Sequence, residues 1–279
     1  MTRHHLAPTA AQRGFTLVEL VVVIIILGIL GGLTAGILLQ PFRAFEDQAR
    51  RAGLVAEADL ALTRMVRELR MALPNSVRIA GEGSYLEFIP TKDGGRYRAL
   101  PDPTDRDRPH PKSDPLNFAT FDKIFDVLGG LAVGAAAGDE LVIYNVTATG
   151  PAANAYIGDN RAPIEKFADG KMTLSAYKLF PFPSLDAQRF DVVPASGPVS
   201  YFCAGGQLRR VTRYGFLREQ PTGFGSGDGQ LLAEGATLCQ FSYQPGDHVR
   251  NGVVTLRLGL TADGETVNLL YQAQAVNAP

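Results

Sequence analysis

The chain has 279 residues, of which 46% are hydrophobic and 20% are charged, and its formal net charge is −1. This length allows one or two domains with a buried core. A nearly neutral chain without a basic block argues against nucleic-acid binding, which needs positive charge against phosphates. The two cysteines, Cys203 and Cys239, are too few for a disulfide framework, but they allow one bridge in an exported domain.

The first element is an apolar run from Phe15 to Leu39, in which the only polar side chains are those of Thr16, Glu19 and Thr34. As a helix, this run is long enough to cross a hydrocarbon layer of about 30 Å. Arg3 and Arg13 precede it, and positive residues favour the cytoplasmic side. A cleaved secretory signal has an apolar region of only about 7–15 residues, which fits poorly. A buried helix of a soluble core fits less well still. The run predicts a single-pass anchor with a cytoplasmic N-terminus and a periplasmic head.

Glu19 is the unusual residue of this run, because a charged carboxylate in a membrane segment costs about 2.5–3.5 kcal/mol. One interpretation is that Glu19 lies near the helix end and reaches the lipid headgroups. The other is that it pairs with a positive group inside the membrane. Cleavage after Gly14 would supply such a group, the free amine of Phe15, and a glycine lets a protease approach closely.

The stretch "RGFTLVELVVVIIILGIL" resembles the class III signal of type IV pilins and type II secretion pseudopilins. The resemblance rests on the glycine at the cut, the phenylalanine after it, the glutamate four residues on and the apolar tail. It implies that prepilin peptidase cuts between Gly14 and Phe15 and N-methylates Phe15. It also implies that Glu19 pairs with the terminal amine of a neighbouring subunit, because paired charges in hydrocarbon offset one another.

The same resemblance implies partners and a location. The partners are other major and minor pilins, prepilin peptidase and the inner-membrane assembly platform, and no cofactor is expected. The protein would lie in the inner membrane and then in a pilus or pseudopilus. Four glycines of the apolar run let helices approach closely, or are simply tolerated in a membrane helix, and both interpretations stay open: Gly28, Gly31, Gly32 and Gly36.

The helix is expected to continue as an amphipathic segment, residues 40–73, with a kink at Pro41 and an end before Pro74. Its predicted apolar stripe consists of Phe42, Phe45, Ala49, Ala52, Val55, Ala58, Leu62, Val66, Leu69 and Leu73. Opposite charges on the other face, such as Arg64 and Glu68, indicate a solvated surface. The sequence thus divides into a leader (1–14), a membrane and filament-core helix (15–39), the extension (40–73) and a β-rich head (74–279).

The head is expected to hold an antiparallel sheet packed on the helix, an α+β fold of the type IV pilin kind with long loops. Its predicted strands are Tyr85–Pro90, Glu140–Val146, Lys171–Leu179, Gln207–Tyr214, Thr237–Gln244, Val253–Leu260 and Thr266–Ala275. Asp263-Gly264 predicts a hairpin between the last two. Two loops are predicted, residues 101–115 and 220–230. Their acids, Asp102, Asp105, Asp107 and Asp228, are interleaved with arginines or stand alone, so they make a poor calcium site.

Three later stretches resemble minor pilins of the mannose-sensitive haemagglutinin (MSHA) pilus system, the MshO-like proteins: "ALPNSVRI", "YFCAGGQLRRVTRYGF" and "GETVNLLYQAQAVNAP". They also resemble the J-type minor pseudopilin of type II secretion. The resemblance implies a minor subunit that helps to initiate, prime or cap a filament. The remote alternative is a membrane-anchored periplasmic hydrolase. The mature chain would hold only two histidines, His110 and His248, and lacks metalloprotease, P-loop and nucleophile-elbow motifs, so we expect no enzyme.

Overall fold

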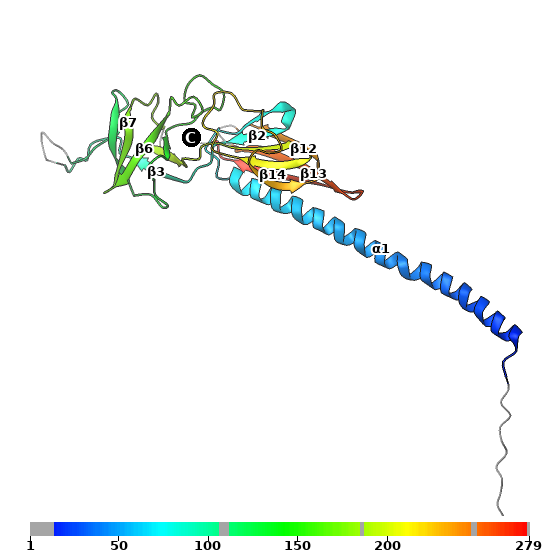
Figure 1. Cartoon of the computed structure of the whole chain (residues 1–279). Coiled ribbons are helices and arrows are strands. Elements are labelled where there is room, and N and C mark those ends of the chain that lie inside the picture. The colour runs from blue at the N-terminus through cyan, green and yellow to red at the C-terminus, as the bar shows by residue number, and fades with distance from the viewer. Residues whose placement is uncertain (1–13, 106–111, 185–186, 247–249, 278–279) are drawn as a thin grey trace, which may run out of the picture. The chain divides into compact units, whose positions relative to one another are not determined.

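The structure is a computed structural model that describes residues 14–105, 112–184, 187–246 and 250–277, with the backbone alone at 35–44. The chain divides into two compact units, Met1–Arg50 and Arg51–Pro279, which we describe separately. A single α-helix, α1 (Leu17–Leu69), contributes residues to both (Figure 1). His110, His248 and Asp107 lie outside the described residues.

In the first unit, the side chains of α1 from Leu17 to Thr34 are exposed, and all of them except Glu19 and Thr34 are apolar. The segment Leu17–Thr34 has a mean hydropathy of 2.7 and is long and apolar enough to cross a membrane. Its one hydroxyl is satisfied internally, because Thr34 Oγ1 donates to the carbonyl of Leu30 at 2.8 Å. A hydroxyl bonded in this way can lie in hydrocarbon at reduced cost. The helical backbone runs on past Pro41, and the kink expected there stays a prediction.

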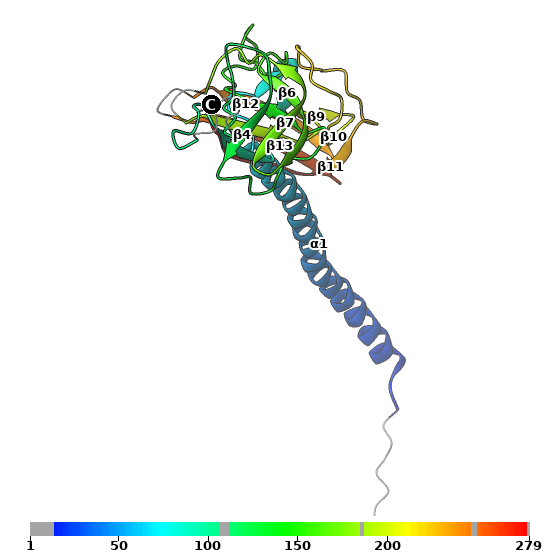
Figure 2. The ribbon, with the colours of Figure 1, turned by 90° about the vertical axis from the view of Figure 1, so that its left-hand side faces the viewer.

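The second unit contains three sheets, of which two pack on the helix. A five-stranded sheet has the order β1-β2-β9-β10-β11, and a three-stranded sheet has the order β12-β13-β14. Figure 2 shows β9, β10 and β11 side by side. The strands are β1 (Arg78–Ala80), β2 (Tyr85–Phe88), β9 (Val199–Ala204), β10 (Gln207–Val211), β11 (Gln230–Glu234), β12 (Ala236–Gln244), β13 (Gly252–Ala262) and β14 (Glu265–Ala275). A short 3-10 turn, η1 (Gly81–Gly83), joins β1 to β2.

The third sheet is a closed barrel with the order β3-β4-β7-β6-β5-β8. Its strands are β3 (Asp93–Tyr97), β4 (Asp122–Leu128), β5 (Glu140–Val142), β6 (Arg161–Ala168), β7 (Lys171–Lys178) and β8 (Arg189–Val193). Figure 1 shows β3, β6 and β7 at one end of this unit and β12, β13 and β14 at the other. Alternate strand residues such as Phe125, Leu141, Ile164 and Phe190 fill its apolar interior.

The fold confirms the α+β class and the packing of β-sheet on the helix, but the expectation of one sheet was wrong. Several barrel strands look like loops in sequence: β3 reads "DGGRY", and β6 contains Pro163. Glycine and proline weaken a strand assignment. For β6, pairing with a strand on each side outweighs the local preference of its residues. It pairs with β5 on one side and with β7 on the other, and the β6–β7 pairing shifts register between Ile164 and Lys166.

The helix packs on the sheets through a face that matches the second half of the predicted stripe, in which Ala58, Leu62 and Leu69 are buried, but not its first half. Its buried residues are Leu54, Ala58, Ala61, Leu62, Met65 and Leu69. Phe45 and Val55, which we placed on the apolar face, are 71% and 41% exposed. The predicted stripe advanced by about 3.3 residues per turn over its first half. A real helix advances by about 3.6, so the predicted positions drift around its surface.

The helix also ends earlier than predicted, at Leu69 instead of Leu73. The next residues enter β-type pairing, because the N–H of Leu73 donates to the carbonyl of Ile89 and the N–H of Thr91 donates to that of Met71, both at 2.7 Å. These bonds replace helical ones and turn the chain toward the sheets. Pro74 and Asn75 then form the turn, in which Asn75 adopts φ 56°.

The hairpin predicted at Asp263-Gly264 is confirmed. β13 and β14 pair in continuous register from Gly252 opposite Ala275 to Ala262 opposite Glu265. Asp263 and Gly264 have φ values of 49° and 85°. Two positive φ values in a two-residue loop match the twist of antiparallel strands, and aspartate followed by glycine adopts them at low cost.

Candidate processing and assembly site at the N-terminus

The candidate site is the start of α1, where Gly14, Phe15 and Glu19 lie within the first turn or just before it. Gly14, Phe15 and Thr16 are non-helical, and the helix begins at Leu17. The Phe15 side chain is 77% exposed. A β-carbon built on Gly14 would meet no atom within 4 Å. Within the described residues, the space around Gly14 is open, which fits the expectation that a protease approaches closely there.

Thr16 caps the helix, a role that the sequence analysis missed. Its Oγ1 accepts a hydrogen bond from the backbone N–H of Glu19 at 3.3 Å, and its carbonyl accepts one from the N–H of Leu20 at 3.2 Å. Thr16 and Glu19 stand three residues apart, the spacing of a capping box. The "T-x-x-E" pattern at residues 16–19 was the signal that could have revealed this cap.

The Glu19 carboxylate is exposed, and it has no hydrogen bond or ion pair within the described part of the chain. Only its backbone takes part in the cap. A carboxylate in the first turn of a helix is favoured by the positive end of the helix dipole. That stabilisation is modest compared with the cost of a charge in hydrocarbon, so an external positive partner would lower the free energy further.

The glycines of the apolar segment have no internal role either. A β-carbon on Gly28, Gly31 or Gly32 would meet nothing within 4 Å. The open space fits both interpretations, namely close approach of a second helix or plain tolerance of glycine in a membrane helix. The Gly36 side-chain position lies outside the described side chains.

The predicted acidic loops use their carboxylates to hold their own backbone. Asp102 Oδ1 accepts from the N–H of Thr104 at 2.9 Å, and Asp228 Oδ2 accepts from the N–H of Gly225 at 2.8 Å. Asp105 Oδ2 accepts from the N–H of Ser113 at 2.7 Å. Among the described residues, no group of three His, Cys, Asp or Glu side chains is placed to hold a metal ion.

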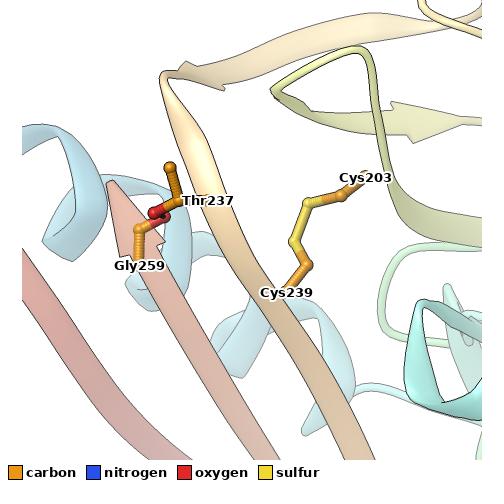
Figure 3. Close-up of a disulfide and its surroundings, with 4 residues drawn as sticks. All are labelled: Cys203, Thr237, Cys239 and Gly259. Carbon is orange, nitrogen blue, oxygen red and sulfur yellow. Dashed lines mark hydrogen bonds between the residues drawn. A yellow bond between two sulfur atoms is a disulfide. The ribbon is translucent and has the colours of Figure 1, made fainter. Parts of the chain in front are cut away.

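Cys203 and Cys239 form a disulfide in the structure, with their Cα atoms 6.2 Å apart. Cys203 belongs to β9 of the five-stranded sheet, and Cys239 belongs to β12 of the three-stranded sheet (Figure 3). The bridge therefore joins the two sheets that pack on the helix. Next to it, β12 and β13 shift register between Ala236 and Leu238, and Thr237 Oγ1 donates to the carbonyl of Gly259 at 3.4 Å (Figure 3).

Comparison with known protein families places the N-terminal region in a recognised class. Residues 9–35 match the family described as the prokaryotic N-terminal methylation motif, the signal of type IV pilins and pseudopilins. This motif supports a type IV pilin-like or pseudopilin-like protein, and it implies processing by prepilin peptidase and pilus-type assembly. The apolar helix fits a single membrane anchor. Comparisons with curated proteins and with solved structures gave no match.

Proposed function

We propose that this protein is a minor type IV pilin of the MSHA kind, which prepilin peptidase cleaves after Gly14 and methylates on Phe15. It would take part in initiating, priming or capping a pilus, and it would have no catalytic activity of its own. The observation that carries the proposal is the start of α1, where an exposed apolar segment begins with a carboxylate that has no partner among the residues that the structure describes. The second candidate, a J-type minor pseudopilin, has the same N-terminal chemistry.

The chemistry of assembly follows from the charges at the helix start. Removal of residues 1–14 creates a positive amine on Phe15, and Glu19 lies one helical turn further on. Two separated charges in hydrocarbon are both unfavourable, whereas a pair between neighbouring subunits offsets much of that cost. Glu19 would thus favour the addition of a subunit in one axial register. The Thr16 cap supports this role because it keeps the first turn helical while the carboxylate stays available.

The three stretches that carry the MSHA resemblance all lie in the unit Arg51–Pro279. Two of the three stretches, residues 201–216 and 264–279, include β9 with β10 and β14, which are strands of the two sheets that pack on α1. The third, residues 72–79, begins three residues after the helix ends at Leu69.

The proposal is tested by Glu19→Gln in the source bacterium, with Glu46→Gln as the matched control. Glu46 is another exposed acid of α1, outside the apolar segment. We expect the Glu19→Gln protein to be cleaved and membrane-anchored but depleted from sheared pili, with the control incorporated as wild type. Incorporation of Glu19→Gln at the wild-type level would contradict the proposal. A defect in protein secretion with normal piliation would favour the pseudopilin instead.

A further inference from the structure

Two arginines lie directly opposite each other on the outer surface of the barrel. Arg96 of β3 pairs in register with Arg189 of β8, and both side chains are exposed. Their chain neighbours Tyr97 and Phe190 are buried among the apolar residues of the barrel interior. Like charges in directly opposite positions of an antiparallel pair are destabilising. Such a pair suggests that a negative group normally lies between the two guanidinium groups.

The same two arginines line a cavity of about 490 Å³, together with Arg70 from the turn after α1. Among the described residues, the side chains of Arg70 and Arg189 make no hydrogen bond or ion pair. Arg96 Nε donates only to a backbone carbonyl, that of Ala187, at 3.1 Å. Within the part of the chain that the structure describes, the cavity therefore presents three guanidinium groups that form no hydrogen bond or ion pair with a carboxylate.

One acid, Asp191, also lines the cavity, and at pH 7.5 its single carboxylate offsets only part of the positive charge of the three arginines. Burial raises the pKa of Asp191 to about 6, although the positive charge of Arg189 acts in the opposite direction. Asp191 lies opposite Gly94 in the β3–β8 register. A β-carbon at Gly94 would come within 3.3 Å of the Phe190 carbonyl and 3.6 Å of Asp191 Oδ1. The missing side chain thus leaves this part of the cavity open.

The remaining lining favours a peptide over a small ion. Met71 and Val276 are 52% and 43% exposed and offer apolar contact for the methylenes of an acidic side chain. Arg70 and Val276 also border a second cavity of about 520 Å³, which Gln272 and Gln274 line with amide groups. The two cavities adjoin at Arg70, so an extended segment can place a carboxylate in the first and its backbone along the second.

We propose that the cavity lined by Arg70, Arg96 and Arg189 binds a glutamate or aspartate carboxylate of an extended acidic peptide segment. The guanidinium forks of Arg96 and Arg189 would hold the carboxylate from two sides, which removes their mutual repulsion. Arg70 would extend the contact to the neighbouring residue of the peptide. The site belongs to the unit Arg51–Pro279 and does not depend on the assembly role of Glu19.

The proposal is tested with the full chain in detergent at pH 7.5, by calorimetric titration with an end-capped triglutamate peptide. An end-capped triglutamine peptide is the uncharged control, and glutarate and inorganic phosphate represent free anions. We expect triglutamate to bind, triglutamine not to bind, and both free anions to bind more weakly. Equal binding of triglutamine and triglutamate would overturn the site. Phosphate or glutarate binding as tightly as the peptide would overturn the assignment to a peptide.

Substitutions of the cavity arginines distinguish a loss of peptide binding from a loss of folding. We expect Arg189→Gln and Arg96→Gln each to weaken triglutamate binding by roughly tenfold or more, because each removes a charge-assisted contact. The same variants should unfold at the same temperature as wild type or higher, since they remove a repulsion. Arg257→Gln is the matched control, because Arg257 is an exposed strand arginine of β13 outside both cavities. Unchanged triglutamate binding in both Arg189→Gln and Arg96→Gln would overturn the proposal.

Discussion

Arg78 of β1 lies directly opposite Glu87 of β2, and the two form an ion pair that is almost wholly buried, with side chains 6% and 0% exposed. The pair is enclosed by further polar contacts. The Arg78 guanidinium donates to the backbone carbonyls of residues 217 and 218 and lies 3.6 Å from the centre of the Tyr156 ring. Tyr214 donates its O–H to Glu87 Oε1 at 2.8 Å. This network ties the loop after β10 to the edge of the five-stranded sheet.

Removing one residue of the Arg78–Glu87 pair should destabilise the fold strongly, and removing both should cost less than the two single losses added together. We expect Arg78→Met to lower the free energy of unfolding by about 3–5 kcal/mol, because it leaves the Glu87 carboxylate buried and unpaired. Burial raises the pKa of Glu87, although the adjacent Arg78 acts in the opposite direction. The double variant Arg78→Met with Glu87→Gln should therefore lose less than the sum of the single changes. Denaturant unfolding measures all three, and a change under ~0.5 kcal/mol in Arg78→Met would refute this view.

Two leucines of α1 test how the helix packs. Leu62 is 0% exposed in the core, whereas Leu60 is 73% exposed. Leu62→Ala should cost about 2–5 kcal/mol because it leaves a cavity, while Leu60→Ala should change stability by less than about 0.5 kcal/mol. Thermal unfolding of the two proteins makes the comparison. Similar losses in both would show that the helix face is assigned wrongly.

The long apolar helix and the final hairpin could be predicted from sequence because each has a strong local signal. The run Phe15–Leu39 is long and apolar enough for a membrane-spanning helix, and Asp263-Gly264 fits one turn type. The barrel could not be predicted, because strands such as β3 and β6 depend on partners that are distant in sequence. The exact buried face of α1 was missed for a related reason, since only the sheet determines which of several apolar positions face inward.

The N-terminal candidate residues Gly14, Phe15 and Glu19 could be proposed from the sequence because they form one contiguous pattern, and their roles stay predictions. The arginine cavity could not be found in this way. Arg70, Arg96 and Arg189 are far apart in sequence, and only the pairing of β3 with β8 beside the end of α1 brings them together.

The disulfide between Cys203 and Cys239 gives a prediction about the exported protein. The cysteines are 36 residues apart, and closure of a loop of this size stabilises a fold by roughly 3–4 kcal/mol through the entropy of the unfolded chain. The Cys203→Ser and Cys239→Ser double variant should lose stability of that order, and a reductant should have no further effect on it. Peptide mapping without reduction should recover the linked pair from the cell envelope. Two freely alkylated thiols there would refute the bridge.

Asp191 should make the free energy of unfolding depend on pH. Its pKa rises from 3.8 in the unfolded chain to about 6 in the folded protein, so the folded state binds more protons between these values. Stability must therefore fall as the pH rises from about 4 to 6, by on the order of 2 kcal/mol. Asp191→Asn should remove this dependence and be more stable than wild type at pH 7.5. Unfolding curves at pH 4, 5, 6 and 7.5 measure the difference, and parallel pH profiles for the two proteins would count against it.

The pilin-like account depends most directly on the chemistry at the start of the mature chain. Mass spectrometry of the N-terminal peptide, from membrane-extracted protein of cells with active prepilin peptidase, measures it. The account predicts a chain that begins at Phe15 and carries one methyl group on the amine, with Arg3 and Arg13 removed. Cells that lack the peptidase should yield the uncut chain as the control. A chain that begins at Met1 in cells with the active peptidase, or one cut beyond Thr34 with the apolar helix lost, would contradict the account.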